Sequence, residues 1–136
     1  MKELFDVHCH MVPGVDDGAA DLEESLEMLK MQHEDGVRKI IITPHYRRRM
    51  FETPAKKVHE QFLKLQEAAK KEYPDMSLYL GCELHSNMDL QDILEKRKYV
   101  TMAGSSYVLL EFSEGDSAQH IRERVYNVLS CGYEPI

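Results

Sequence analysis

The segment at residues 37–43, VRKIIIT, most constrains the fold of this chain. It contains three consecutive isoleucines, Pro44 follows it, and a helix-like segment lies on each side of it. A short apolar run bounded in this way is typical of a strand that is buried on both faces, as in a parallel sheet. The chain is therefore expected to build a parallel sheet whose strands are connected by helices.

Strand-like and helix-like segments alternate along the rest of the sequence. Asp21 and Glu24 form a capping box before a helical repeat of leucines, and Thr53-Pro54 is a typical helix start. This succession predicts an α/β protein with parallel strands, either as an open sheet or curled toward a barrel. Strands are predicted over residues 4–8, 37–43, 77–84 and 107–112, and helices from Asp21 to Gly36, from Thr53 to Pro74, over 89–98 and over 117–131.

Composition limits the classes of function. The 136 residues fit one domain, and 43% apolar with 30% charged residues describe an ordinary globular protein. A net charge of −7 argues against a nucleic-acid surface. Neither a signal peptide nor a membrane-length apolar run is present, so no membrane insertion and a cytoplasmic location are expected. The three cysteines predict reduced thiols, and none has an arginine six positions later, which excludes the phosphate loop of cysteine-dependent tyrosine phosphatases.

Ligand-type side chains stand at the predicted ends of four strands. His8 and His10 end the first strand, and His45 follows the second. Glu83 and Glu111 end the two later strands in the same way. Because the carboxyl ends of parallel strands meet at one edge, these side chains are expected to lie together. Mixed imidazole and carboxylate ligands suit zinc, manganese or iron rather than calcium, so the pattern favours a metal site.

The loop after the first strand adds two aspartates. In HCHMVPGVDDG, residues 8–18, either Asp16 or Asp17 is close enough to join the ligand set. Side chains alternate along a strand, so Cys9 points away from its histidine neighbours and is expected to be a packing residue. Glu83 could bridge two cations and so build a site for more than one metal.

Each of these residues also has a purely structural interpretation. A histidine pair can be satisfied within a core, and a glutamate at a strand end can cap a helix or face water. Four such explanations would be needed at once, so we favour the metal site. The cluster Tyr46-Arg47-Arg48-Arg49 is either a solvated surface or a site where one arginine binds a phosphate oxygen. His33, His59 and His120 are expected to be packing or surface residues, whereas His85 is left unassigned.

Four motifs resemble the PHP (polymerase and histidinol phosphatase) superfamily. They are DVHCH followed by PGVDDGA near the start, ITPH at residues 42–45, GCE at 81–83 and LLEF at 109–112. More narrowly, they resemble the manganese-dependent protein tyrosine phosphatases that are encoded with capsule and exopolysaccharide genes in Gram-positive bacteria. The resemblance covers essentially the whole chain, and its opening motif is highly specific.

The resemblance implies a metal-dependent phosphomonoester hydrolase, and most specifically a protein tyrosine phosphatase. Its substrate would be phosphotyrosine on the tail of the tyrosine kinase that regulates capsule polymerisation. The implied cofactor is Mn²⁺, two or three ions in a complete site, with Zn²⁺ or Fe²⁺ as alternatives. An arginine after His45, here Arg47, would lie near the phosphate. The implied metal ligands are His8, His10, Asp17, His45, Glu83 and Glu111.

The chain departs from this family in length. The family's domain is a longer, distorted (β/α)7 barrel, whose later strands supply a further histidine and arginine and then an Asp-x-His pair. Residues 1–136 therefore resemble the N-terminal portion of such a domain, a partial TIM-like barrel, and residues 132–136 resemble the start of the next strand. An opened barrel exposes a strand edge and an apolar interior, so a homodimer or domain exchange is expected.

Two other functions stay open at this point. A different PHP phosphoesterase, such as one acting on histidinol phosphate, would use the same ligands. The chain could instead be a catalytically incomplete metal-binding or assembly fragment, because a full cluster needs ligands from the rest of the family's domain. A metal-dependent amidohydrolase also begins with H-x-H, but the continuation VDDGA fits it poorly.

Overall fold

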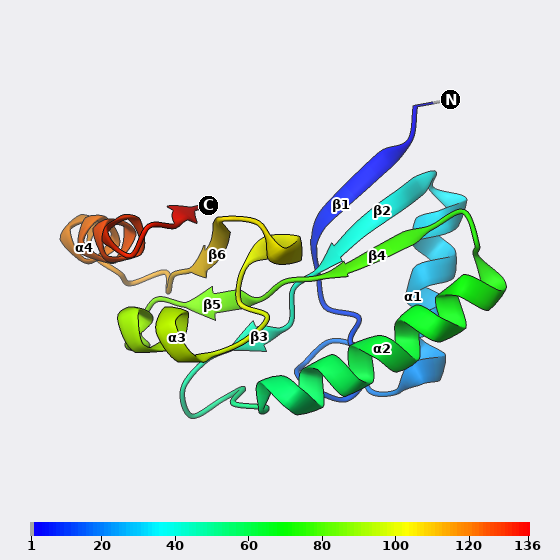
Figure 1. The fold of residues 1–136 in the computed structure, drawn as a ribbon, viewed down its shortest axis with the longest axis horizontal. Coiled ribbons are helices and arrows are strands. Elements are labelled where there is room, and N and C mark those ends of the chain that lie inside the picture. The colour runs from blue at the N-terminus through cyan, green and yellow to red at the C-terminus, as the bar shows by residue number, and fades with distance from the viewer. Residues whose placement is uncertain (1) are drawn as a thin grey trace.

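The named strands of the computed structural model are all parallel, and helices connect most of them (Figure 1). The structure describes residues 2–136. The strands are β1 (Leu4–Cys9), β2 (Val37–Ile42), β3 (His45–Tyr46), β4 (Ser77–Leu80), β5 (Glu83–His85), β6 (Tyr107–Glu111) and β7 (Glu134–Pro135). The helices are α1 (Leu22–Glu34), α2 (Ala55–Glu72), α3 (Leu90–Lys96) and α4 (Ala118–Ser130), with a 3-10 turn, η1, at Met102–Gly104. No helix in this range is long and apolar enough to cross a membrane.

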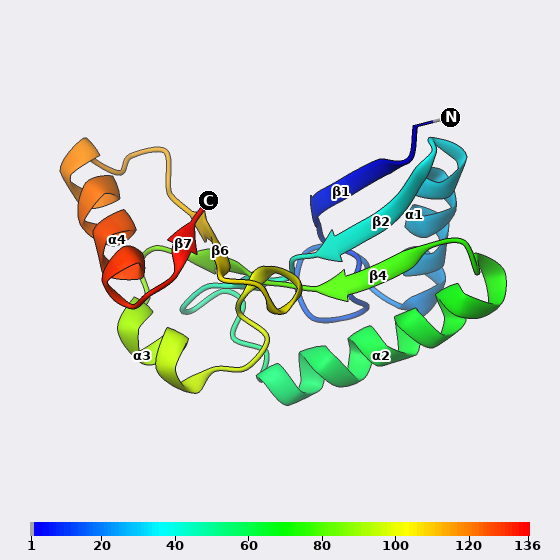
Figure 2. The same cartoon turned by 45° about the horizontal axis from the view of Figure 1, so that its top comes forward.

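The strands form two sheets, of order β1-β2-β4 and β3-β5-β6-β7, that meet end to end. Backbone hydrogen bonds cross the junction, because the amide of Gly81 donates to the carbonyl of Ile42 and that of Glu83 donates to Pro44. Figures 1 and 2 show β4 running on into β5 through the middle of the molecule. This arrangement confirms the predicted α/β fold of a partial barrel. Between residues 2 and 136 the barrel is not closed, since β1 and β7 each pair with one neighbour.

α1 and α2 cover one face of the first sheet (Figure 1). α1 begins after Asp21, whose side chain accepts a hydrogen bond from the amide of Glu24, as the capping-box pattern predicts. Ile40 of β2 and Leu65 of α2 are fully buried in the core between helices and sheet. Removal of these apolar side chains from water holds the helices on this face.

A second core lies beneath the other sheet. Side chains of α3 and α4 pack with those of β5 and β6, and Leu84 and Val108 are fully buried there. Asp89 and Ser117 accept hydrogen bonds from the first turns of α3 and α4, so both helices start where the sequence predicts. The two cores lie on either side of the sheet junction, where the candidate ligands are found.

The prediction of one strand over residues 77–84 is wrong. β4 stops at Leu80, and β5 starts at Glu83 in the other sheet. Gly81 lies at the break, where an added Cβ atom would come within 3.0 Å of the Met102 sulfur and 3.1 Å of Ile41. A side chain at this position would be tightly packed against these neighbours, and a glycine within a strand-like run often marks an interruption of this kind. β3, which the sequence analysis did not predict, resumes the path of β2 after Pro44, a residue without an amide hydrogen.

The face of the first sheet opposite α1 and α2 is apolar and open. Phe5 is 60% exposed, Val7 is 53% exposed and Tyr79 is 42% exposed. Together with side chains of β2 they line a recess of about 330 Å³. The prediction that residues 37–43 are buried on both faces is therefore wrong for most of the strand, because Lys39 is exposed and Ile41 is half-buried on this second face. Ala103 of η1 lines only part of it.

Candidate metal centre

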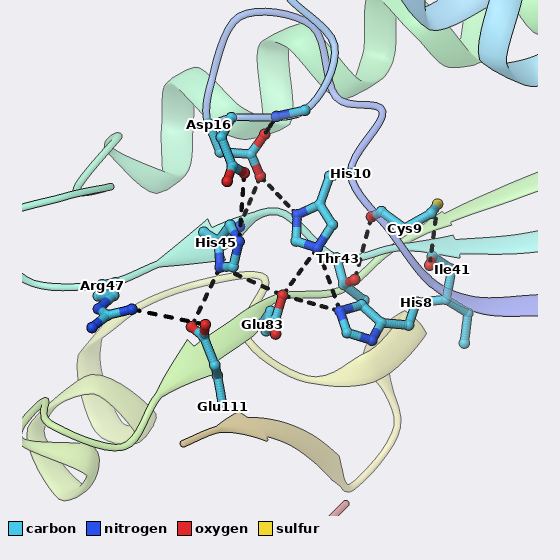
Figure 3. Close-up of polar contacts among 12 residues, drawn as sticks. His8, Cys9, His10, Asp16, Ile41, Thr43, His45, Arg47, Glu83 and Glu111 are labelled. Atoms are coloured by element: carbon cyan, nitrogen blue, oxygen red, sulfur yellow. Dashed lines mark hydrogen bonds and ion pairs between the residues drawn. The ribbon is translucent and has the colours of Figure 1, made fainter. Parts of the chain in front are cut away.

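The ligand candidates lie together where β1 ends, β3 and β5 begin, and β6 ends (Figure 3). The prediction that Glu83 ends a strand is therefore wrong, because it is the first residue of β5. His45 and Glu83 are paired in register on β3 and β5, and Glu111 ends the adjacent strand β6. His8 on β1 and His10 just beyond its end approach Glu83 from the other side. The parallel order of the strands thus gathers side chains as far apart in the sequence as His8 and Glu111.

The carboxylate of Glu83 stands at the centre of the cluster (Figure 3). Its Oε2 atom lies 3.0 Å from Nε2 of His8 and 3.0 Å from Nε2 of His10. The same oxygen lies 3.4 Å from Nδ1 of His45. Glu83 is buried, so one carboxylate oxygen faces three imidazole nitrogens with little access to water. These donor atoms are the ones that zinc, manganese and iron prefer.

His45 and Glu111 extend the cluster away from β1. Nδ1 of His45 and Oε2 of Glu111 lie 3.4 Å apart, yet both atoms are buried and neither makes a hydrogen bond. Across the imidazole ring, Nε2 of His45 lies 3.5 Å from Oδ1 of Asp17. A buried polar atom without a partner is unfavourable, so these two atoms require a further group between them. A divalent cation fits that requirement.

Three overlapping groups of side chains have ligand atoms close enough to hold an ion. Within each group the ligand atoms all lie within 4.8 Å of one another. Because the groups overlap, the arrangement suits several cations at neighbouring positions, bridged by common ligands. The groups are His8, His10 and Glu83; His10, Asp17 and His45; and His45, Glu83 and Glu111.

Within the cluster, the pKa of His10 is raised and that of Glu83 is lowered. Hydrogen bonds to Asp16 and to Glu83 raise the pKa of His10 to about 10. Burial on its own would raise the pKa of Glu83, but the hydrogen bonds from His10 and His8 outweigh it and hold that pKa at about 2. Without a cation, an imidazolium thus lies beside an ionised carboxylate at neutral pH. Metal binding must displace the imidazolium proton, since a ligating imidazole is neutral.

The two adjacent aspartates take different places. The side chain of Asp17 is 63% exposed and faces His45, whereas that of Asp16 is 1% exposed. Asp16 accepts hydrogen bonds from Nδ1 of His10 and from the amide of His45, each at 3.0 Å. It also accepts one from the amide of Gly18 at 2.9 Å. A carboxylate only accepts, so Nδ1 of His10 carries a hydrogen and Nε2 faces Glu83. The loop thus presents one candidate ligand and one residue that orients a ligand.

Replacing Asp16 with alanine is expected to weaken Mn²⁺ binding by about 10- to 100-fold, because carboxylates that orient a ligating histidine contribute on that scale. Isothermal titration calorimetry of the metal-free chain measures the affinity. Asp75→Ala is the matched control, since Asp75 also pairs with a histidine, His33 on α1. An affinity that is unchanged in Asp16→Ala would contradict the orienting role.

Arg47 lies at the rim of the cluster. Its Nη1 atom is 3.9 Å from Oε1 of Glu111, and its side chain faces the ligand candidates (Figure 3). Arg48 and Arg49 are exposed in the turn that follows. Of the three consecutive arginines, Arg47 is therefore the one whose guanidinium is placed to contact an anion held at the cluster.

The other histidines and the cysteines lie outside the cluster. His85, left unassigned by the sequence, is buried, and its Nε2 atom lies 3.1 Å from Oγ of Ser113. Burial raises the pKa of the Cys9 thiol, and it raises that of Cys82 to about 12. The three cysteines are free, as predicted. The remaining histidines pair or stack with nearby side chains, as expected for His33, His59 and His120.

Sequence reasoning missed Phe51, which packs against a ligand candidate. Its ring stacks on that of His45, with the centroids 5.1 Å apart and the planes 15° from parallel. The ring of His10 lies 4.4 Å from the same imidazole, so His45 is in contact with both rings. No local signal marks Phe51, because the contact depends on the turn that follows β3.

Comparisons with known proteins agree on one family. The chain matches the family described as capsular polysaccharide synthesis, CpsB/CapC, over residues 4–136. It is 38% identical to the tyrosine-protein phosphatase CpsB of Streptococcus pneumoniae over 133 residues. The alignment covers 98% of this chain and 55% of CpsB. It is 29% identical to the tyrosine-protein phosphatase YwqE of Bacillus subtilis, across 98% of this chain and 52% of YwqE.

A solved structure shows the same fold. A crystal structure from a study of YwqE of Bacillus subtilis and CpsB of Streptococcus pneumoniae, described as metal-dependent tyrosine phosphatases, superimposes on this chain with a TM-score of 0.85. The match covers 97% of this chain and 53% of the other, at 29% sequence identity. The chain thus spans about half the length of the relatives that it matches.

Proposed function

The chain belongs to the CpsB/CapC family of capsular polysaccharide synthesis, and from this premise we propose that it takes part in metal-dependent hydrolysis of phosphotyrosine. The observation that carries the proposal is the buried Glu83 carboxylate, which faces the imidazoles of His8, His10 and His45. Its relatives are named tyrosine-protein phosphatases. Because the chain spans about half of their length, the activity is proposed for a domain of which residues 1–136 form the N-terminal portion.

The proposed metal ligands are the six residues of the three overlapping groups. Glu83 would hold cations together with the imidazoles of His8, His10 and His45, and Asp16 fixes the orientation of His10. When bound, cations such as Mn²⁺ supply a hydroxide nucleophile at neutral pH and positive charge for the phosphoryl oxygens. Zn²⁺ and Fe²⁺ suit the same donors. The ligands are His8, His10, Asp17, His45, Glu83 and Glu111.

Arg47 binds the phosphoryl group in this proposal. A guanidinium presents two parallel N–H donors to two oxygens of a phosphate, which both orients the ester and stabilises charge that shifts during hydrolysis. The Nη1 atom of Arg47 is 3.9 Å from Glu111, at the edge of the cluster. The guanidinium is therefore within reach of a phosphate held beside Glu111.

The cysteines have no part in this chemistry. A nucleophilic cysteine must reach the thiolate form and the substrate. Cys9 and Cys82 are held in the thiol form by burial, which raises the pKa of each. Hydrolysis by a water-derived nucleophile is therefore favoured over a phosphocysteine intermediate.

The proposed substrate is a phosphotyrosine-bearing protein segment, the tail of a capsule tyrosine kinase, and the proposed location is the cytoplasm. The test is hydrolysis of a phosphotyrosine peptide by the chain loaded with Mn²⁺, with histidinol phosphate as the competing substrate. We expect release of phosphate from the peptide that stops when EDTA removes the metal. Faster turnover of histidinol phosphate would assign the chain to another phosphoesterase. Metal binding without hydrolysis of either ester would indicate that residues 1–136 alone are a metal-binding or assembly fragment, and absence of metal binding would contradict the proposal.

A second copy of this chain is the proposed partner for the open barrel. The edge strands β1 and β7 each lack one neighbour within residues 2–136, and both would pair in parallel with the opposite edge of another copy. Phe5, Val7 and Tyr79 form an exposed apolar face that such pairing would cover. We expect a dimeric mass in light scattering coupled to gel filtration, and monomers for Val7→Asp. A monomeric wild-type chain would contradict this proposal.

A further inference from the structure

The turn that carries the three arginines is built as a short hairpin after β3. The amide of Arg47 donates to the carbonyl of Phe51, and the amide of Phe51 donates back to Arg47, both at 2.8 Å. The amide of Met50 also donates to the carbonyl of Arg47 at 3.2 Å. The exposed tip contains Arg49 with a φ of 66°, a strained conformation for a side chain of this kind.

Arg97 fixes both ends of this turn. It follows α3, and its guanidinium lies over the ring of Tyr46, 3.6 Å from the centroid. The same guanidinium donates a hydrogen bond from Nη2 to the carbonyl of Thr53 at 2.9 Å. Tyr46 directly precedes Arg47, and Thr53 lies just beyond the turn. One side chain thus joins the segment that enters the turn to the segment that leaves it.

The backbone around Thr53 also connects to the aspartate loop. The hydroxyl of Thr53 donates to the carbonyl of Val15 at 2.9 Å, one residue before Asp16. The contacts of Arg97 therefore place the arginine turn relative to the loop that holds His10 in orientation. The turn also has its own hydrogen bonds and the stacking of Phe51 on His45. The amide of Arg48 lies 3.0 Å from the Met88 sulfur, but this contact holds the tip and not the two ends that Arg97 joins.

We propose that Arg97 is a positioning residue that holds the turn of residues 47–51 so that Arg47 faces the candidate metal cluster. This inference rests on the proposed function, in which Arg47 binds the phosphoryl group. Arg97 does not touch the cluster and acts through Tyr46 and Thr53. A planar guanidinium suits this role, because it can stack on a ring while its edge donates a hydrogen bond.

The test compares Arg97→Ala with the wild-type chain in two measurements. The first is the hydrogen exchange rate of the Arg47 and Phe51 amides, measured by NMR on the metal-free chain. The second is the affinity of the Mn²⁺-loaded chain for inorganic phosphate, measured by calorimetry. Arg38→Ala is the matched control, since Arg38 also pairs its guanidinium with backbone carbonyls and with Asp75, away from this turn.

We expect Arg97→Ala to speed exchange of both amides and to weaken phosphate binding by about tenfold, the scale of a charge-assisted hydrogen bond lost from Arg47. The amount of Mn²⁺ bound per chain and the exchange of core amides should stay as in the wild type. Tyr46→Leu, which removes the other side of the stack, should reproduce both effects. Arg97→Lys keeps the charge but not the planar group, so it should not restore phosphate affinity.

Either of two results would overturn the inference. One is wild-type exchange of the Arg47 and Phe51 amides in Arg97→Ala, and the other is full recovery by Arg97→Lys, which would assign the effect to charge alone. The exchange measurement needs neither metal nor phosphate. If the Mn²⁺-loaded wild-type chain binds no phosphate, the proposed function fails, while the exchange rates still decide whether Arg97 positions the turn.

Discussion

Glu83→Gln is expected to lower the affinity of this chain for Mn²⁺ by at least about 100-fold, more than loss of an orienting carboxylate does, and to abolish any phosphatase activity. The Glu83 oxygen faces three imidazole nitrogens, two of them at 3.0 Å. Glutamine has the same shape but carries no negative charge, and it binds cations weakly and bridges them poorly. The variant therefore tests the charge and the bridging role without leaving a cavity.

The same substitution has a second expected effect, on His10. Glu83 is one of the two groups whose hydrogen bonds raise the pKa of His10 to about 10, the other being Asp16. Removing the charge of Glu83 should lower that pKa, which NMR titration of the His10 ring in the metal-free chain measures. Glu95→Gln on the exposed face of α3 is the control for loss of one negative charge. Wild-type Mn²⁺ affinity in Glu83→Gln would contradict the central position assigned to this carboxylate.

Gly18→Ala is expected to destabilise the chain by about 3 kcal/mol or more, at the upper end of the effects of overpacking. A Cβ atom at Gly18 would lie 2.0 Å from the carbonyl oxygen of His10 and 2.6 Å from its Cβ atom. Both contacts involve atoms that cannot move without shifting the backbone of the ligand loop. The amide of Ala19 donates to the same carbonyl at 3.1 Å, so the clash also removes a hydrogen bond that closes the loop.

Urea unfolding followed by circular dichroism measures this destabilisation. Gly115→Ala is the matched control, because an added Cβ atom there meets nothing within 4 Å. We expect the control to unfold at the wild-type urea concentration and Gly18→Ala to unfold at a lower one, with weaker Mn²⁺ binding. Equal stability of the two variants would mean that the loop adopts another path around His10.

Much of this fold can be predicted from the sequence, because the signals that start its helices involve residues only a few positions apart. The capping box at Asp21 and the helix start at Thr53-Pro54 place α1 and α2. Glu83 and Glu111 could be singled out because an acid that ends an apolar run is unusual, although only Glu111 ends a strand and Glu83 begins β5. The rule that parallel strands present their carboxyl ends at one edge places the candidates close together, but it does not predict that His45 and Glu83 begin the strands of a second sheet.

Other features depend on contacts that the sequence does not display. The strand break lies at Gly81, which packs against Met102 and Ile41, residues far from it in the chain. Asp16 orients His10 whereas Asp17 faces His45, and this difference depends on how the loop folds back over His10. Two adjacent aspartates cannot be distinguished in this way from the sequence. The contact of Arg97 with Tyr46 joins the end of α3 to β3, so no local pattern contains it.

The central claim is that a cation cluster forms around Glu83 at the junction of the two sheets. Anomalous diffraction from crystals of the chain grown with Mn²⁺ tests it most directly, because it locates each manganese ion. We predict manganese peaks in coordination contact with the Glu83 carboxylate, flanked by the imidazoles of His8, His10 and His45. Crystals without manganese at Glu83, or with manganese only at other acidic residues, would contradict the account.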